Sequence, residues 1–167
     1  MKSLIHFSFK KNIQSYWEMT KPDINFLIVI STFLGYFLGA QFIGESIFAN
    51  PLVLIHLMIG SFLSSSGVAI LNEYIERDQD AKMNRTCKRP LPSGRIAPKS
   101  ALIFGIAISV IGVLELALLV NLYSGILSFS TIAFYLFIYT PMKQKTPWNT
   151  LVGAIPGALP PVGGWLA

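Results

Sequence analysis

Long stretches without a charged residue alternate along the chain with short segments that concentrate the charges. Several of these stretches exceed the roughly 18 to 20 residues that an α-helix needs to cross about 30 Å of hydrocarbon. They run over Ile24–Gly44, Ser46–Asn72, Ser100–Leu114, Leu116–Met142 and Thr146–Ala167. The pattern predicts an all-α polytopic transmembrane helical bundle and largely excludes the soluble fold classes.

About five membrane helices are expected from this pattern. We place them near Ile24–Phe42, Pro51–Glu76, Ser100–Val120, Gly125–Tyr139 and from Asn149 to the C-terminus. Gly35 and Gly39 have the four-residue spacing that allows helices to pack closely. Gly153, Gly157 and the Pro160–Pro161 pair could break the last helix beside a cavity, although glycine and proline are also common in membrane helices.

Charge is scarce in this chain and is concentrated on one predicted side of the membrane. Only 13% of the residues are charged, whereas soluble domains carry about a quarter. If the N-terminus is cytoplasmic, all 13 Lys and Arg residues fall in the N-terminal segment and in the inner loops 77–99 and 140–148. This segregation indicates that the basic loops lie on the cytoplasmic or matrix side. The net charge of +5 then reflects the orientation of the chain in the membrane rather than nucleic-acid binding.

The N-terminal segment, residues 1–23, mixes basic and aromatic side chains. They include Phe7, Phe9, Lys10, Lys11, Tyr16 and Trp17. The segment lacks the apolar core and cleavage site of a signal peptide, and its composition favours an amphipathic segment on the membrane surface. The single cysteine, Cys87, has no partner for an intramolecular disulfide and belongs to no zinc-binding pattern.

The end of the second predicted helix carries the residues with the clearest chemistry. If this helix continues past the membrane edge, Asn72, Glu76 and Asp80 line one face over about 12 Å, because each four-residue step rotates by only about 40°. Stacked carboxylates repel one another unless a cation or basic side chains lie between them. Oxygen ligands of this kind suit Mg²⁺. Asp78 projects to the other side of a continuous helix, where it can pair with Arg77 or Lys82, but it joins the site if the helix ends there.

A basic loop follows at once. Its cations are Arg85, Lys88, Arg89 and Arg95. Pro90, Pro92 and Gly94 interrupt it and end any helix. An acidic face that holds Mg²⁺, next to arginines that offer paired hydrogen bonds, would bind a diphosphate. A charged loop that merely orients the protein in the membrane is the alternative interpretation.

This stretch resembles the first aspartate-rich motif of the UbiA superfamily of intramembrane prenyltransferases. The residues that carry the resemblance are Asn72-x-x-x-Glu76-x-Asp78-x-Asp80-x-x-Met83-x-Arg85-Thr86-x-x-Arg89-Pro90-Leu91-Pro92-x-Gly94. With Glu76 in the middle acidic position, the motif resembles that of the protoheme IX farnesyltransferase (heme O synthase) branch. Thr20-Lys21-Pro22 and the segment Tyr139–Asn149 agree with that branch, and the resemblance extends from about Glu18 to Ala167.

The resemblance implies transfer of farnesyl from farnesyl diphosphate to a vinyl group of heme b, with addition of water, to give heme O and diphosphate. It implies Asn72, Glu76 and Asp80 as catalytic residues that hold Mg²⁺ against the leaving diphosphate, with Asp78 as a further candidate ligand. The candidates to bind the phosphates are Lys21, Arg85, Arg89, Lys143 and Lys145. The apolar helices would shield an allylic cation from water.

The resemblance also implies a location and partners. The location is the bacterial cytoplasmic (inner) membrane or the mitochondrial inner membrane, and the partners are the lipid bilayer and heme A synthase or terminal oxidase assembly factors. His56 lies inside the second predicted helix, where a neutral His bonded to a neighbouring helix is favoured over a heme ligand. Glu115, near the outer end of the third helix, receives no role.

The chain departs from the family in one respect. Family members have about nine membrane helices and a second acidic motif, and no such motif occurs here outside residues 73–80. We therefore expect residues 24–167 to be a partial UbiA-type domain in a truncated chain that is inactive alone. A UbiA-type aromatic prenyltransferase acting on a quinone precursor and a non-catalytic membrane assembly protein stay open. A transporter half is disfavoured, because nearly all charges lie at one membrane edge.

Overall fold

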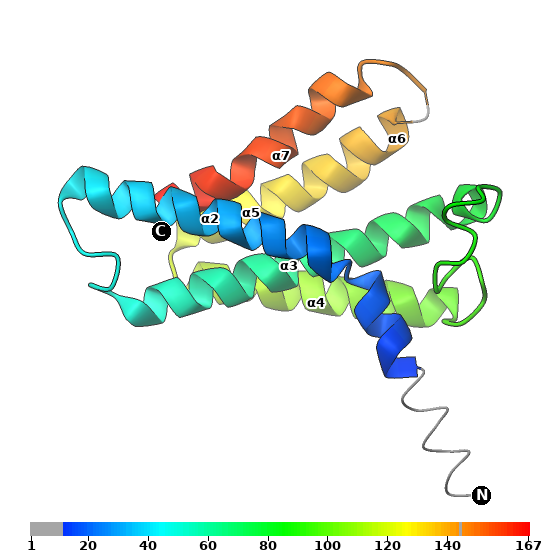
Figure 1. The fold of residues 1–167 in the computed structure, drawn as a ribbon, viewed down its shortest axis with the longest axis horizontal. Helices are drawn as coiled ribbons and strands as arrows, with labels where there is room; N and C mark the ends of the chain where they lie inside the picture. The colour runs from blue at the N-terminus through cyan, green and yellow to red at the C-terminus, as the bar shows by residue number, and fades with distance from the viewer. Residues whose placement is uncertain (1–11, 144) are drawn as a thin grey trace, which may run out of the picture.

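The structure is a computed structural model that describes residues 12–143 and 145–167, so the first eleven residues of the predicted amphipathic segment lie outside the described residues. Residues 12–19 are helical. The elements that follow are α2 (Pro22–Ile43), α3 (Pro51–Asp80), α4 (Pro98–Leu119), α5 (Leu122–Phe134), the π-helical turn η1 (Tyr135–Tyr139), α6 (Thr140–Met142) and α7 (Asn149–Trp165) (Figure 1). The all-α prediction is confirmed, since the described residues contain no strand.

Within the described residues, four helical units are long and apolar enough to cross a membrane. They are α2, α3, α4 and the continuous unit Leu122–Met142 that α5, η1 and α6 form together. Their outer faces are apolar, and Phe42, Leu118 and Phe137 are each more than three quarters exposed. An apolar exterior of this extent suits lipid rather than water, so this is an integral membrane protein. The fifth predicted helix also forms, but α7 has 17 residues and is not among these four units.

Three helices begin with a proline. Two of them, α2 and α4, begin two residues earlier than the hydrophobic pattern predicted, and α3 begins where it was predicted. Pro22, Pro51 and Pro98 lie in the first turns of α2, α3 and α4, where the missing N–H would have no partner within the helix. The predicted starts at Ile24 and Ser100 were therefore late.

The end of α3 and the continuity of α7 also differ from the prediction. α3 continues past Glu76 to Asp80, which satisfies the condition for a single acidic face. α7 is unbroken although Pro156, Pro160 and Pro161 lie within it, so the predicted break is wrong. Prolines are tolerated in membrane helices where neighbouring helices pack against the freed backbone groups.

Glycines bring the helix backbones close together. A Cβ atom at Gly35 of α2 would overlap the Pro161 carbonyl of α7, and one at Gly164 of α7 would overlap the Thr32 carbonyl of α2. A Cβ at Gly39 would lie 3.2 Å from the Trp165 carbonyl oxygen. The predicted close packing at Gly35 and Gly39 is confirmed. α2 thus bridges α7 and the α3–α4 pair (Figure 1).

His56 and Glu115 link α3 to α4 within the membrane. The His56 Nδ1 and Glu115 Oε1 atoms lie 2.7 Å apart, and both side chains are partly buried. The interpretation of His56 as a side chain bonded to a neighbouring helix is confirmed. The sequence had given Glu115 no role, and the structure makes it the partner of His56.

Residues 12–19 do not simply lie on the outer surface. Met19 is fully buried and packs with Ile70, Leu91, Ile96 and Ala101 from α3, the basic loop and α4. Arg95 fixes this segment: its guanidinium donates two hydrogen bonds to Glu18, at 2.7 and 2.9 Å, and one to the Lys88 carbonyl at 2.6 Å. The basic loop and the N-terminal helix therefore form one unit at this end of the bundle.

Arg95→Lys is expected to loosen residues 12–19, because an ammonium cannot make the paired bonds to Glu18 and also reach the Lys88 carbonyl. Since the pair is partly exposed, we expect about a five-fold faster backbone hydrogen exchange in residues 12–19. Lys99→Arg is the matched control, because Lys99 is exposed. Equal exchange in Arg95→Lys and the unsubstituted protein would show that Arg95 does not hold this segment.

Candidate active site

The last turns of α3 carry a buried polar face. Asn72, Glu76 and Asp80 are 4%, 6% and 5% exposed, and they lie on one side of the helix, as their spacing predicted. Burial of two carboxylates is costly unless cations offset their charge. The face is therefore built for cationic partners.

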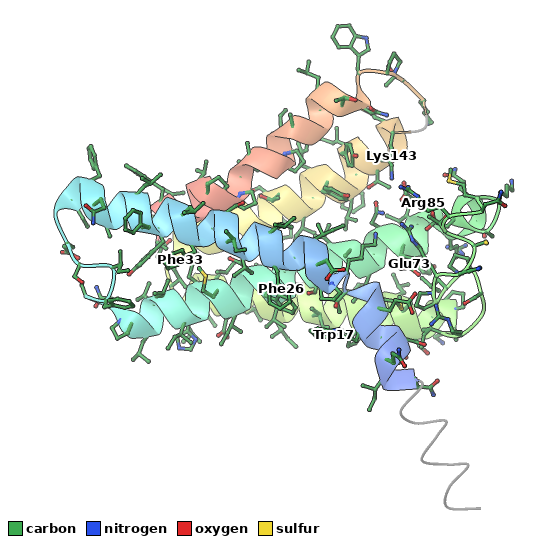
Figure 2. All side chains as sticks on the ribbon, in the orientation of Figure 1. Trp17, Phe26, Phe33, Glu73, Arg85 and Lys143 are labelled. Atoms are coloured by element: carbon green, nitrogen blue, oxygen red, sulfur yellow. The ribbon has the colours of Figure 1, made fainter. Side chains whose placement is uncertain are left out.

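Two basic side chains from different loops meet these carboxylates. Lys143, just after α6, donates to both Glu76 carboxylate oxygens at 3.0 and 3.2 Å. Arg89, from the loop after α3, donates to Asp80 Oδ2 at 2.6 Å. Figure 2 shows Lys143, Arg85 and Glu73 at the same end of the bundle. The predicted acidic face and two of the predicted phosphate-binding cations thus lie together.

The amide of Asn72 is held from two sides. Its Nδ2 donates to Glu76 Oε2 at 2.8 Å, and its Oδ1 accepts from the Thr140 hydroxyl at 3.0 Å. Thr140 is 1% exposed. The sequence reading named Thr140 only as part of the Tyr139–Asn149 segment and gave it no role, because a threonine beside a proline at a helix end carries no chemical signal of its own.

Glu73 is a further buried carboxylate without a predicted role. It is 1% exposed and accepts a hydrogen bond from the Leu91 backbone N–H at 3.2 Å. The Thr86 hydroxyl donates to the Asp80 carbonyl at 2.9 Å. These two bonds dock the basic loop against the end of α3, so that Arg89 reaches Asp80. Its position at the polar end of the second predicted helix was the only sequence signal for Glu73.

Lys21 lies at the N-terminus of α2 in the left-handed region, at φ 51°. Burial lowers the pKa of its ammonium and the nearby Arg89 lowers it further, while the carboxylates of Glu73, Glu76 and Asp80 act in the opposite direction. Among the described residues, no carboxylate lies within ion-pair distance of Lys21. Its charge is therefore free to meet an anion.

Three other candidates form no ion pair with this cluster within the described residues. The Asp78 side chain is 81% exposed and lies 3.6 Å from Arg77, because α3 continues as a regular helix and turns it to the opposite side. The possibility that Asp78 joins the acidic face is therefore not realised. Arg85 and Lys145 are exposed, and neither is in an ion pair within the described part of the chain.

A cavity of about 300 Å³ begins beside this cluster and extends into the bundle between α2, α3, α5 and α7, with Leu116 of α4 in its wall. Lys21 and Tyr139 line it at the charged end, and Leu57 and Leu116 line it deeper in the membrane. Along α3 the lining runs from Ala69 to Leu57, which corresponds to about 18 Å of helix. The Tyr135 and Tyr139 rings, with centroids 4.9 Å apart, flank the charged end.

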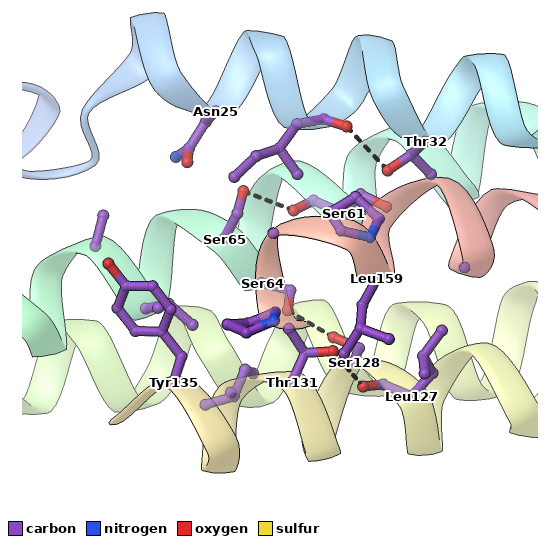
Figure 3. A pocket seen from close by; sticks show the side chains of 18 of the residues that line it. Asn25, Thr32, Ser61, Ser64, Ser65, Leu127, Ser128, Thr131, Tyr135 and Leu159 are labelled. Atoms are coloured by element: carbon purple, nitrogen blue, oxygen red, sulfur yellow. Dashed lines mark hydrogen bonds between the residues drawn. The ribbon is translucent and has the colours of Figure 1, made fainter. Parts of the chain in front are cut away.

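The cavity wall carries several hydroxyl groups, and most of them form hydrogen bonds within the wall. Ser65 donates to the Ser61 carbonyl, Thr131 to the Leu127 carbonyl, and Ser64 and Ser128 bond each other at 2.6 Å (Figure 3). Their hydrogen-bonding capacity is largely satisfied within the wall. Ser124, which also lines the cavity, differs from these three groups: its buried Oγ has no hydrogen-bond partner among the described residues.

The oxygen atoms on the α3 face fit a hard divalent cation such as Mg²⁺ by their chemistry. Within the described residues, however, no three His, Cys, Asp or Glu side chains are grouped to hold a metal ion. Asn72, Glu76 and Asp80 would hold such an ion only with further oxygen ligands, such as those of a phosphate. Lys143 and Arg89 would then have to exchange their carboxylate partners for phosphate oxygens.

A charged cluster at the mouth of an apolar intramembrane cavity is typical of helical membrane proteins that bind an anion with a long apolar chain. The UbiA prenyltransferase family model matches residues 28–167. The chain belongs to the UbiA prenyltransferase family. None of the solved structures compared with it matches.

Several curated relatives are similar over almost the whole chain. The protoheme IX farnesyltransferase of Solibacter usitatus is 49% identical over 159 residues, 93% of this chain and 54% of the relative. That of Salinibacter ruber is 42% identical over 91% of this chain and 52% of the relative. That of Gloeothece citriformis is 37% identical over 96% and 48%. The chain therefore spans about half the length of these relatives.

Proposed function

We propose that the protein containing this chain transfers the farnesyl group of farnesyl diphosphate to a vinyl group of heme b. The bond between farnesyl C1 and the diphosphate oxygen breaks, and a bond from C1 to the vinyl carbon forms. Water adds its oxygen to the other vinyl carbon and releases a proton, which leaves heme O and diphosphate. The observation that carries the proposal is the buried acidic face with its basic partners at the mouth of an apolar cavity.

The basic residues would bind the diphosphate. Lys21 has no ion-pair partner among the described residues, and Lys143 and Arg89 reach the acidic face from two separate loops. Arg85 and Lys145 are exposed at the same end and would meet the outer phosphate oxygens. Arginine suits this role because its planar guanidinium can bond two phosphate oxygens at once.

Asn72, Glu76 and Asp80 would hold Mg²⁺, which we propose as the cofactor. When bound, the metal offsets the negative charge that develops on the leaving diphosphate. The three side chains contribute a fixed set of oxygen atoms on one helical face, and phosphate oxygens of the diphosphate would supply further ligands.

The cavity would accommodate the farnesyl chain. Three isoprene units match its apolar lining, and its length of about 18 Å along α3 is of the right order for a C15 chain. The bundle keeps water from the allylic carbon, and the paired Tyr135 and Tyr139 rings at its mouth present aromatic faces that attract positive charge. Heme b supplies the reacting π electrons, so no nucleophilic side chain is needed.

We also propose the orientation of the protein in the membrane. The basic loop after α3 and the segment after α6 lie at the same end of the bundle (Figure 1), and positive charge marks the cytoplasmic or matrix side. The site would therefore open toward the compartment that contains farnesyl diphosphate. Heme A synthase and terminal oxidase assembly factors are the proposed protein partners.

The intact gene product, in membranes that lack other heme O synthases, is expected to form heme O from farnesyl diphosphate, heme b and Mg²⁺. Mass spectrometry of extracted heme detects the farnesyl and hydroxyl groups. The comparison uses the same membranes with a quinone-ring precursor in place of heme b. Prenylation of the quinone precursor alone would replace this proposal with an aromatic prenyltransferase, and no product from either acceptor would favour a non-catalytic assembly protein.

A further inference from the structure

The helix from α5 to α6 changes its register just before it reaches the acidic face. The residues of this helix that line the cavity include Ser124, Ser128, Thr131, Tyr135 and Tyr139, at intervals of four, three, four and four residues. The next residue bonded to α3 is Thr140, five positions after Tyr135, and Lys143 follows. The π-helical turn at Tyr135–Tyr139 provides the extra residue.

This register brings two pairs of residues together. Thr140 and Lys143, three residues apart, meet Asn72 and Glu76, four residues apart on α3. In an uninterrupted α-helix one residue corresponds to a rotation of about 100°, so without the extra residue Thr140 and Lys143 would point away from this face. π-Helical turns are rare and occur frequently at functional sites.

The Thr140 hydroxyl has one proton and two acceptors in reach. They are Asn72 Oδ1 at 3.0 Å and the Tyr135 carbonyl at 2.9 Å. The Tyr135 carbonyl already accepts the backbone N–H of Thr140, which closes the π-helical turn. The Thr140 hydroxyl can therefore keep its hydrogen bond to Asn72 Oδ1. When that oxygen takes a new partner, the hydroxyl can instead donate to the Tyr135 carbonyl, so that no buried group is left without a hydrogen bond.

We propose that Thr140 and the π-helical turn are a positioning device for Asn72. The Thr140 hydroxyl and Glu76 bond opposite ends of the Asn72 amide, so the amide oxygen is held in a defined orientation on the acidic face. Thr140 does not itself contact the ligand; it is a positioning residue. This inference rests on the proposed function, because it assigns the Asn72 oxygen to the cation that accompanies the diphosphate.

The test compares Thr140→Val, which keeps the shape but removes the hydroxyl, with Thr140→Ser, which keeps the hydroxyl. Mn²⁺ affinity in the presence of inorganic diphosphate is measured by electron paramagnetic resonance on the intact gene product in lipid nanodiscs. Loss of a side chain that orients a metal ligand costs about 10- to 100-fold in affinity, and this loss is expected for Thr140→Val. Thr140→Ser is expected to restore the affinity of the unsubstituted protein.

Thr150→Val is the matched control, because Thr150 is exposed and its hydroxyl bonds only the neighbouring Asn149 side chain. Deletion of Phe137, an exposed residue within η1, tests the register and is expected to lower Mn²⁺ affinity at least as much as Thr140→Val. Unchanged Mn²⁺ affinity in Thr140→Val would overturn this inference alone. Failure of the unsubstituted protein to bind Mn²⁺ with diphosphate would overturn the metal-dependent function as well.

Discussion

Replacing Glu76 by Gln is expected to lower kcat/KM for farnesyl diphosphate by about 10²–10³-fold. Glu76 is 6% exposed, accepts hydrogen bonds from Lys143 and Asn72, and lies at the centre of the acidic face. The amide keeps the size of the side chain but removes the charge that would hold a divalent cation. The measurement is steady-state formation of heme O by the intact gene product at several Mg²⁺ concentrations.

Asp78→Asn is the matched control for Glu76→Gln. It removes the same charge from the same helix two residues away, but the Asp78 side chain is 81% exposed and lies beside Arg77 instead of the cluster. Its activity is expected to equal that of the unsubstituted protein. Equal losses in both variants would mean that the net charge of the loop matters rather than the buried face.

Replacing Gly35 by Ala is expected to destabilise the bundle by about 1–3 kcal/mol. The new Cβ atom would overlap the Pro161 carbonyl oxygen, which belongs to the α7 backbone and cannot move aside as a side chain could. α2 and α7 would have to separate, which would disturb the cavity between them. The free energy of unfolding, measured in bicelles by steric trapping, gives the size of the effect.

Gly157→Ala is the control for Gly35→Ala. Gly157 lies in α7, and a Cβ atom there would meet nothing within 4 Å. Since alanine favours a helix over glycine by up to about 1 kcal/mol, the free energy of unfolding should stay the same or increase. If Gly35→Ala also left the free energy of unfolding unchanged, α2 and α7 would not approach each other as closely at Gly35 as the structure shows.

The acidic face was predictable because it depends on one helix. Asn72, Glu76 and Asp80 share a side wherever α3 is regular, and the structure extends α3 through Asp80. The placement of Asp78 depended on where that helix ends, which the sequence pattern placed near Glu76. Membrane helix ends are poorly marked by hydropathy, because a helix can leave the hydrocarbon and continue.

The partners of that face were less predictable. Lys143 was a candidate, but its contact with Glu76 joins residues 67 positions apart, and the Thr140 contact with Asn72 joins residues 68 apart. Such contacts depend on how two helices pack and on the register of each. A π-helical turn changes that register, and a search for the 3.6-residue period does not reveal it.

The sequence by itself determined that this is a helical membrane protein, and its charge pattern predicted that the basic residues lie on one side of the membrane. It did so because hydrocarbon excludes charges and requires each spanning segment to bond its own backbone. Only the tertiary structure decided that Arg89 and Lys143 neutralise the acidic face, that Glu73 docks the basic loop, and that α7 stays unbroken. Those features arise from the close approach of segments distant in sequence, which hydropathy and spacing do not encode.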